Sequence, residues 1–372
     1  MNDTACLSFM RQALALAIRV QRSTTPNPRV GCVVVAGEEV VGVGYHCGPG
    51  TDHAEAVALK AAGAAARGAA LYVNLEPCHH TGKTPPCTES IIRHGVGRVV
   101  AAMQDPDPRV DGAGFSALRE AGVQVDVGLL ESDARWLNAG FVNWHETGRP
   151  WVTLKAAVSA DGLLAAAGGD SHWISNPESR RFTHRQRAEH DAILVGAGTV
   201  RRDDPRLTVR LGARDASPLP VILSSRLELN RDARLFCEGR RPLVYTLESA
   251  DQQKVEGLSS SADIVRLPSK TGNDEQVEID ALLDDLGRRG IQHLLVEGGA
   301  AVTGAFVTAR RVDRVIAFMN PRFLGARGAV PWVDADAVAS PAEGLAIRRT
   351  ATMALGEDLV IMGDAISVDA GD

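Results

Sequence analysis

Three short segments near the start of the chain carry side chains that can hold one metal ion. They contain His53, Cys78 and Cys87. An imidazole and two thiolates fill three of the four positions around a tetrahedral zinc ion, and water takes the fourth. A zinc site that keeps an open position is catalytic rather than structural. The sequence therefore predicts a fold that brings these three segments together around one zinc ion.

Glu55 stands two residues after His53 and constrains where that fold places both side chains. On the flank of a helix, side chains two residues apart diverge by roughly 200°, so both reach one metal only from the first turn. Residues 48–52 are expected to form the preceding turn and to supply the helix cap. Glu55 is the predicted catalytic residue, which moves a proton from water to a ring nitrogen and on to the leaving ammonia. Together these residues are typical of zinc-dependent deaminases of pyrimidine-type rings.

Eight residues, 79–86, separate the two cysteines. A separation of two is typical of deaminases that act on cytidine or on adenosine in tRNA. The longer loop adds cationic and hydroxyl side chains beside the metal. We predict that Lys83 and Thr84 hold a phosphate group and that His80 faces the substrate ring. The alternative is a solvated loop without a binding role.

The charge balance argues against a nucleic-acid partner. The chain has 40 Lys and Arg against 46 Asp and Glu, a net charge of −6, whereas proteins that grip a nucleic-acid backbone usually have a basic surface. A small-molecule substrate is therefore expected.

No apolar run approaches the ~18 residues that a membrane span needs, and no signal-peptide pattern opens the chain. Five of the six cysteines lie before residue 90, which in a reducing cytosol indicates metal binding or catalysis. We expect a cytoplasmic protein without a membrane partner, and a homo-oligomer because such domains often associate.

Alternating strands and helices predict an α/β fold in both parts of the chain, each sheet being covered by helices. In the first part the predicted strands are 30–35, 40–44, 70–75, 98–103 and 123–127, and the predicted helices are 5–20, 53–66, 88–94, 113–121 and 129–144. In the second part the predicted strands are 151–157, 192–195, 220–223, 243–246, 264–267, 293–296 and 314–319, with helices at 278–289 and 303–309. Residues 249–277 are otherwise expected to be loop-rich surface. Gly148, Arg149 and Pro150 mark the boundary, so the predicted domains are 1–147 and 148–372.

The first domain resembles the deaminase half of the bifunctional riboflavin biosynthesis deaminase/reductase family. The resemblance rests on Thr25–Cys32, His53–Glu55, Glu76–Cys78 and Gly82–Cys87. It implies a cytidine-deaminase-like α/β/α domain that removes the 2-amino group of a diamino-hydroxy-pyrimidine carrying a ribosylamino 5-phosphate. Asn27 would then contact the substrate ring. Residues 78–81 depart slightly from the Cys-Ser-His pattern of the family, so His79 receives no role.

The residues of the second domain predict a bound nucleotide, but less specifically than the residues of the first domain predict a metal ion. Residues 196–201 begin like a dinucleotide fingerprint, but Arg201 stands where its third glycine belongs. The strand 220–223 ends in Ser224, Ser225 and Arg226, which suit the 2′-phosphate of NADP better than the ribose hydroxyl of NAD. Residues 296–300 follow another strand, and their glycines would let a backbone approach a pyrophosphate. Plain β/α turns explain the same residues.

The second domain is also similar to the reductase half of that family. The matching segments are Lys155–Gly162, Ser171–Trp173, Gly198–Arg210 and Val296–Gly299. The resemblance implies a dihydrofolate-reductase-like α/β fold that uses NADPH to reduce the ribosyl group of the deaminated product to a ribityl chain. It implies NADPH contacts at Val158, Trp173, Thr199, Asp203, Ser225 and the segment 297–305, which includes Gly298 and Gly299. It implies substrate contacts at Ser171, Arg187, Leu207, Arg210 and Glu297, and Lys155 would orient the sugar.

Arg187 and Arg210 fit phosphate clamps because a guanidinium fork matches phosphate oxygens, although either would equally serve as a solvated surface charge. Three other functions stay open at this point. One is a nucleic-acid base deaminase with an accessory nucleotide-binding domain. Another is a deaminase whose second domain senses NADPH without catalysis. The last is a related reductase that acts on an antibiotic or a pterin-like compound.

Overall fold

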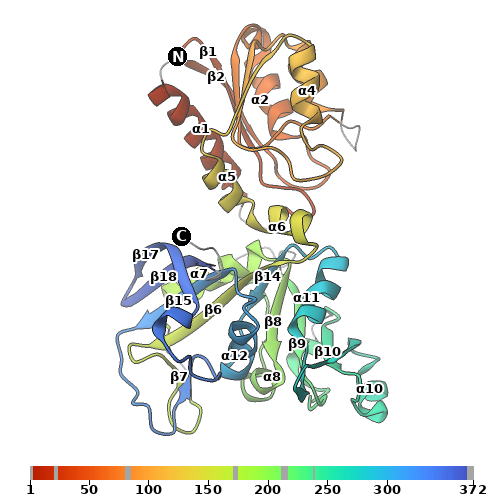
Figure 1. Cartoon of the computed structure of the whole chain (residues 1–372), viewed down its shortest axis with the longest axis vertical. Helices are drawn as coiled ribbons and strands as arrows, with labels where there is room; N and C mark the ends of the chain where they lie inside the picture. Colours follow the sequence, from red (N-terminus) through yellow and green to blue (C-terminus); the bar gives the residue numbers. More distant parts are fainter. Residues whose placement is uncertain are drawn as a thin grey trace. The chain divides into compact units, whose positions relative to one another are not determined.

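The computed structural model describes residues 3–20, 24–79, 85–170, 175–210, 217–237 and 239–366. The chain divides into two compact units, Met1–Thr147 and Gly148–Asp372 (Figure 1). Each unit has its own sheet and its own hydrophobic core.

Unit 1 contains a five-stranded sheet with the strand order β2-β1-β3-β4-β5. Its strands are β1 (Gly31–Ala36), β2 (Glu39–Tyr45), β3 (Ala70–Val73), β4 (Arg98–Ala101) and β5 (Gln124–Val127). β1 pairs antiparallel with β2 and β3, whereas β3, β4 and β5 are parallel. The helices are α1 (Asp3–Ala17), α2 (Ala54–Ala62), the 3-10 helix η1 (Gly63–Ala66), α3 (Cys87–Arg93), α4 (Ala113–Glu120), α5 (Glu131–Leu137) and α6 (Ala139–Thr147).

Helices cover both faces of this sheet, so unit 1 has three layers. One core joins α2, α3 and α4 to the sheet through Leu59, Ile91 and Phe115, and the other joins α1, α5 and α6 to it through side chains that include Met10 and Phe141. The apolar residues whose spacing predicted these helices are therefore the residues that are buried against the sheet.

The prediction of one helix over 129–144 is wrong, because α5 and α6 are separate helices that meet at Asn138. The Asn138 side chain is buried and pairs with the backbone of Arg29, accepting from its N–H at 2.8 Å and donating to its carbonyl at 3.0 Å. A side-chain amide that replaces a strand partner in this way fixes the segment that leads into β1.

Glycines in β2 let α2 lie directly on the sheet. A Cβ added to Gly44 would stand 2.2 Å from the carbonyl oxygen of Ala54, and one added to Gly42 would stand 2.2 Å from that of Ala58. Any larger residue would push the helix away. The position of the first turn of α2 is therefore set by β2.

Unit 2 contains a nine-stranded sheet with the order β11-β10-β9-β8-β14-β6-β15-β18-β17. The strands are β6 (Trp151–Ser159), β8 (Ala192–Gly196), β9 (Leu219–Leu223), β10 (Leu243–Leu247), β11 (Asp263–Leu267), β14 (His293–Val296), β15 (Arg314–Asn320), β17 (Ala346–Leu355) and β18 (Asp358–Ile366). The seven strands from β11 to β15 in this order are parallel, and the hairpin β17–β18 extends the sheet antiparallel. Two small ribbons pair β7 (Leu163–Ala165) with β16 (Val330–Pro331), and β12 (Ser269–Lys270) with β13 (Asn273–Val277).

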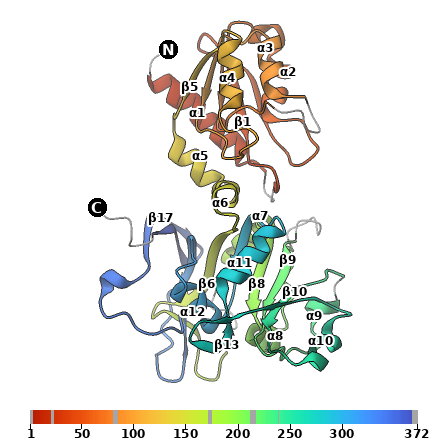
Figure 2. The ribbon, with the colours of Figure 1, turned by 45° about the vertical axis from the view of Figure 1, so that its right-hand side comes forward.

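The helices of unit 2 cover both faces of the sheet. They are α7 (Pro177–Glu189), α8 (Ala197–Asp203), α9 (Arg234–Cys237), α10 (Gln252–Leu258), α11 (Ile279–Arg288) and α12 (Ala300–Thr308), with a 3-10 turn at Pro341–Glu343. Leu286 of α11 and Phe306 of α12 belong to one core, and Figure 2 shows both helices on the same side of the sheet. Val200 of α8 and Leu258 of α10 belong to another core.

Three parts of unit 2 differ from the sequence-based expectation. Residues 249–277 are not mostly loop, because α10, β11, β12 and β13 lie there. Helix α7 and the hairpin β17–β18 were not predicted. The buried residues of α7 are Ser179, Thr183, His184 and Ala188, so the helix has no long apolar stripe to reveal it.

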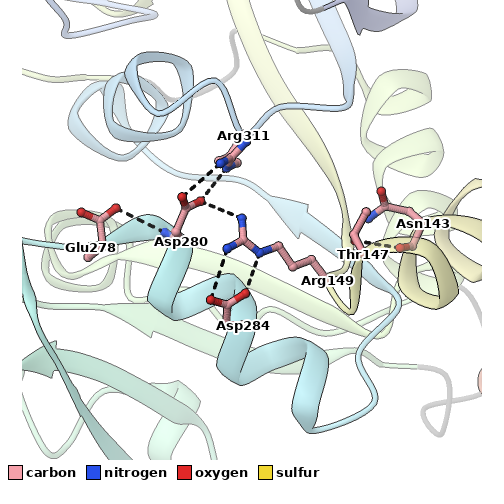
Figure 3. A network of polar contacts seen from close by, with 7 residues as sticks. All are labelled: Asn143, Thr147, Arg149, Glu278, Asp280, Asp284 and Arg311. Carbon is pink, nitrogen blue, oxygen red and sulfur yellow. Dashed lines mark hydrogen bonds and ion pairs between the residues drawn. The ribbon is translucent and has the colours of Figure 1, made fainter.

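The start of unit 2 is fastened to α11 by a charged network (Figure 3). The Arg149 guanidinium bonds Asp284 through two nitrogens at 2.6 and 3.2 Å and bonds Asp280 at 3.0 Å. Arg311 bonds the same Asp280 carboxylate at 2.5 and 3.0 Å. A Cβ added to Gly287 would lie 1.8 Å from the Gly148 carbonyl oxygen, so a glycine is needed for this close approach.

Replacing Gly287 by alanine should destabilise unit 2 although alanine favours helices. The new methyl group meets backbone, and overpacking of this kind costs about 1–3 kcal/mol of unfolding free energy. Gly257 of α10 is the matched control, because its added Cβ would meet only the flexible end of Arg231. Thermal unfolding should show a lower midpoint for Gly287→Ala and an equal or higher one for Gly257→Ala. Equal midpoints for the two variants would contradict the packing argument.

Candidate active sites

The three predicted metal ligands converge in unit 1. His53 immediately precedes α2 in an extended conformation, Cys78 follows β3, and Cys87 is the first residue of α3. The His53 Nδ1 atom lies 3.5 Å from Cys78 Sγ and 3.3 Å from Cys87 Sγ. The predicted turn at residues 48–52 supplies no cap, because His53 itself is the N-cap and makes no side-chain capping bond. Its ring is instead directed at the two thiols.

These separations fit a tetrahedral zinc ion. Bonds of about 2.3 Å to sulfur and about 2.0–2.1 Å to nitrogen place neighbouring ligand atoms about 3.6 Å apart. All three donor atoms lie within 4.8 Å of one another. The Cys87 backbone N–H donates to Cys78 Sγ at 3.3 Å, and the Cys87 thiol and His53 also bond that sulfur. These bonds lower the pKa of Cys78 to about 4, so it is a thiolate at neutral pH.

Glu55 lies in the first turn of α2 and is buried, with 3% of its surface exposed. Burial, and then the charge of Cys78, raise the pKa of the Glu55 carboxyl to about 7. A carboxyl that gains and loses a proton near neutral pH is suited to general acid–base catalysis. The structure therefore places a buried carboxyl that titrates near neutral pH beside the three predicted metal ligands.

Asn27 is oriented by His46, a residue to which the sequence analysis assigned no role. The Asn27 side-chain nitrogen lies 2.8 Å from His46 Nε2, and His46 Nδ1 lies 3.2 Å from the Asp52 carbonyl oxygen. A carbonyl only accepts, so Nδ1 carries the proton and Nε2 accepts from the amide. The Asn27 Oδ1 atom is consequently left to accept from a ligand, and the second amide N–H is left to donate. Sequence alone gives no signal for this pair, which is 19 residues apart.

Glu76 secures the backbone next to Cys78. Its buried carboxylate accepts four backbone N–H bonds, from Asp105, Gly112, Gly114 and Phe115, at 2.9–3.3 Å. Asn74 likewise bonds the backbone of Arg29 and Gly31. These polar groups hold the loops that carry the ligands, and their partners lie too far along the chain to be foreseen.

Five predicted site residues lie outside the described part of the structure: His80, Lys83, Thr84, Ser171 and Trp173. Their roles stay predictions.

Unit 2 has a cavity of about 670 Å³ at the ends of β8 and β14 and beside β6. Six predicted residues line it, namely Lys155, Thr199, Asp203, Glu297, Gly298 and Gly299. Gly299 caps α12, and the nearest atom to a Cβ added there would be Thr199 Oγ1 at 3.9 Å, so the start of the helix is open to a ligand. Backbone N–H groups at an open helix start suit a pyrophosphate, and the size of the cavity suits a cofactor.

The other described candidates of unit 2 do not line this cavity. Val158 is buried within β6, and Ser225 follows β9 with its carbonyl accepting from the Thr246 hydroxyl at 3.0 Å. Leu207 is buried with a positive φ of 51°, and Arg210 is exposed. Their binding roles stay predictions.

A buried charge cluster stands at one wall of the cavity. Arg187 holds both oxygens of Glu297 at 2.9 Å and also donates to the Thr208 carbonyl at 3.3 Å. Lys155 Nζ lies 3.9 Å from Glu297. Although burial raises it, the pKa of Glu297 is lowered to about 2 by Arg187 and Lys155. Burial lowers the pKa of Lys155, against the opposing effect of Glu297.

Comparison with known proteins gives one family match in each half of the chain. Residues 4–103 match the family "Cytidine and deoxycytidylate deaminase zinc-binding region", and residues 150–361 match "RibD C-terminal domain". The riboflavin biosynthesis protein RibD of Aquifex aeolicus is 40% identical over 95% of this chain and 97% of its own. That of Escherichia coli K12 is 39% identical over 86% of this chain and 89% of its own.

The chain belongs to the RibD family.

Solved structures of the family have the same fold. RibD of Acinetobacter baumannii superposes with a TM-score of 0.86 at 34% identity, covering 98% of this chain and 99% of the other. A deaminase/reductase of Thermotoga maritima superposes with a TM-score of 0.82 at 32% identity and the same coverage. The predicted fold class is therefore confirmed: a cytidine-deaminase-like domain followed by the α/β reductase domain of RibD.

As a RibD protein, the chain is a bifunctional enzyme of riboflavin biosynthesis, a deaminase and a reductase that uses zinc and NADPH. Its substrate is a small phosphorylated pyrimidine, and the alternative of a nucleic-acid base deaminase is not favoured. Among the described residues no helix is both long and apolar enough to span a membrane.

Replacing Arg187 by alanine should strongly destabilise unit 2 at pH 7. It leaves the Glu297 carboxylate buried without its bidentate partner, which typically costs ~3–5 kcal/mol of unfolding free energy. The wild-type pKa of Glu297 is about 2, so its ion pair stabilises the fold at neutral pH and is lost only as pH falls through about 2. In the variant Glu297 takes up a proton at a higher pH, so the deficit should shrink between pH 7 and pH 4. Urea unfolding at both pH values measures this change.

Arg241→Ala is the control for that experiment. Arg241 bonds Asp263 at 2.5 Å, but both side chains are about half exposed. Exposed pairs contribute about 0–1 kcal/mol. Equal losses for the two variants would show that burial does not decide the strength of the Arg187 pair.

Proposed function

We propose that residues 1–147 carry the deaminase and residues 148–372 the reductase, acting in turn on one 5-phosphorylated pyrimidine. The first substrate is 2,5-diamino-6-(5-phosphoribosylamino)pyrimidin-4-one, in keeping with the activities named for the Thermotoga maritima relative. The observation that carries the proposal is the meeting of His53, Cys78 and Cys87 beside the buried carboxyl of Glu55. It supports hydrolytic deamination of a ring in unit 1.

In the deaminase, His53, Cys78 and Cys87 would hold zinc, which when bound would supply Lewis acidity to a water molecule near neutral pH. Glu55 accepts a proton from the attacking water and donates it to a ring nitrogen. Glu55 then passes the second proton to the amino group as the carbon–nitrogen bond breaks and ammonia leaves. A carboxyl with a pKa of about 7 suits both directions of transfer. Asn27 Oδ1 accepts from an N–H group of the ring, because the bond of the amide nitrogen to His46 fixes the orientation of the side chain.

In the same site, His80 faces the ring, and Lys83 and Thr84 bind the 5-phosphate. The support is chemical: an ammonium and a hydroxyl in the loop between the two thiol ligands suit a phosphate. A Lys83→Ala variant with an unchanged substrate KM would contradict this assignment.

In the reductase, NADPH supplies a hydride and the protein supplies position and charge. Thr199, Asp203 and the Gly298–Gly299 segment hold the dinucleotide in the cavity, with further contacts from Val158, Trp173 and Ser225. Ser171, Arg187, Leu207, Arg210 and Glu297 contact the substrate. Lys155 lines the cavity, and its lowered pKa makes its proton easier to give to a sugar oxygen as the ring opens.

We further propose a cytoplasmic homo-oligomer. The six cysteines are all free, which suits a reducing compartment. The outer strand β17 is ten residues long and lies at the edge of its sheet, and an edge strand offers backbone groups for pairing with a second copy.

Glu55→Gln should abolish ammonia release while leaving the reductase intact. The amide keeps the shape of the side chain but neither gains nor loses a proton near neutral pH, so we expect a loss of ~10³-fold in kcat, within the usual range of general acid–base catalysis. Glu89→Gln is the matched control, since Glu89 lies in the first turn of α3 but is exposed. Ammonia release and NADPH oxidation with pre-deaminated substrate are followed separately. Loss of both activities in Glu55→Gln would contradict two independent sites.

Cys87→Ala should lower the zinc content of purified protein from one ion per chain to well under half. Only two of the three protein ligands remain, and Cys78 loses a hydrogen-bond partner as well. Cys47→Ala is the control because Cys47 is exposed and outside the ligand cluster. Metal analysis after exhaustive dialysis measures both. Full zinc occupancy in Cys87→Ala would remove Cys87 from the ligand set.

A further inference from the structure

Three cationic side chains line the cavity of unit 2, and they differ in what holds them. Lys155 faces Glu297, and Arg180 donates to the Ser175 carbonyl at 2.5 Å. For the exposed Arg202, no hydrogen bond or ion pair is found within the described residues. A cation without a protein partner at the wall of a cavity is available to an anionic ligand.

Arg201, the neighbour of Arg202 in the last turn of α8, does have a protein partner. Arg201 is bound to Glu228, donating to its carbonyl at 2.9 Å and lying 3.6 Å from its carboxylate. The Arg202 guanidinium lies over Gly169: a Cβ added there would be 3.2 Å from the Arg202 Cζ atom. Gly169 has a φ of +85°, a backbone conformation that favours glycine. The absence of a side chain at this position also leaves room for the guanidinium.

The arginines expected from the sequence to bind phosphate do not line the cavity. Arg226, which we expected to suit a 2′-phosphate, bonds Glu275 at 2.6 Å. Arg187 uses two nitrogens on Glu297 and another on Thr208. The negative charge of a dinucleotide in the cavity is therefore met by other cations.

We propose that Arg202 binds a phosphate group of NADPH. The inference rests on the proposed reductase function of unit 2. Thr199 and Arg202 are three residues apart on α8, so they share a helix face, and both line the cavity. Thr199 Oγ1 is also the nearest neighbour of the Gly299 position at the start of α12. Arg202 thus supplies a full positive charge on the side of the cavity where the helix start supplies N–H groups.

The test measures NADPH binding directly, without turnover, by the change in nucleotide fluorescence on titration with full-length protein. Arg202→Ala should raise the Kd for NADPH about 10-fold, as expected for loss of one charge-assisted contact at a partly exposed site. Arg202→Lys should fall between Arg202→Ala and wild type, because lysine keeps the charge but not the planar fork. Arg201→Ala is the control and should stay within about twofold of wild type, since Arg201 is committed to Glu228.

Two further readouts make the outcome decisive. NADH and NADPH titrations of each variant show whether the lost contact is with the 2′-phosphate, which NADH lacks, or with the pyrophosphate that both share. Unchanged NADPH affinity in Arg202→Ala overturns the proposal, and so does an effect confined to the KM of the pyrimidine substrate. Absence of NADPH binding by the wild-type protein would instead contradict the reductase function itself.

Discussion

Each unit of this RibD protein keeps ionisable side chains out of water, and the backbone around them is arranged to satisfy that burial. In unit 1 the start of α3 donates to Cys78, and Glu76 takes four backbone N–H bonds. In unit 2 Arg187 and Lys155 flank Glu297. An isolated buried charge is unfavourable by several kcal/mol, so these partners determine which side chains retain their charge at the site. The same burial raises the pKa of Glu55 to about 7, which suits the proposed role of this carboxyl in proton transfer.

Glycines let helices pack closely on the sheets, and this close packing sets the geometry of the sites. Gly44 allows α2 to contact β2 beneath Ala54, immediately next to His53. In unit 2, a Cβ on Gly196 or Gly298 would lie 2.7 or 2.5 Å from Val302 of α12. In both units a helix that begins at the site packs closely against a glycine. The metal ligands and the cofactor cavity are therefore positioned by rigid elements and not by loops alone, which keeps their atoms in register.

Sequence patterns predicted what depends on residue type and short spacing. The convergence of His53, Cys78 and Cys87, the place of Glu55 in the first turn of α2, and the buried strands of both sheets belong to this class, because thiolates, an imidazole and apolar runs have few alternative uses. The interruption at Asn138, the His46–Asn27 pair and the role of Glu76 belong to another class. Each depends on a partner between 19 and 109 residues away, so no local pattern encodes it. Helix α7 was not predicted for a related reason. Its buried face is mostly polar, and the contacts of that face form only in the folded protein.

The two proposed reactions leave the 5-phosphate of the pyrimidine unchanged, which has a consequence for charge in both units. Each unit must recognise the same dianion, and unit 2 must also bind the phosphates of its cofactor. Counting arginines in the sequence does not distinguish these tasks, because Arg201 and Arg226 are each bound to a carboxylate of the protein. Only the hydrogen-bond pattern separates a structural guanidinium from one that is open to a ligand. A cavity wall that combines an open helix start with an uncommitted arginine is selective for a polyanion, and a dinucleotide with several phosphates meets that requirement better than a sugar with one.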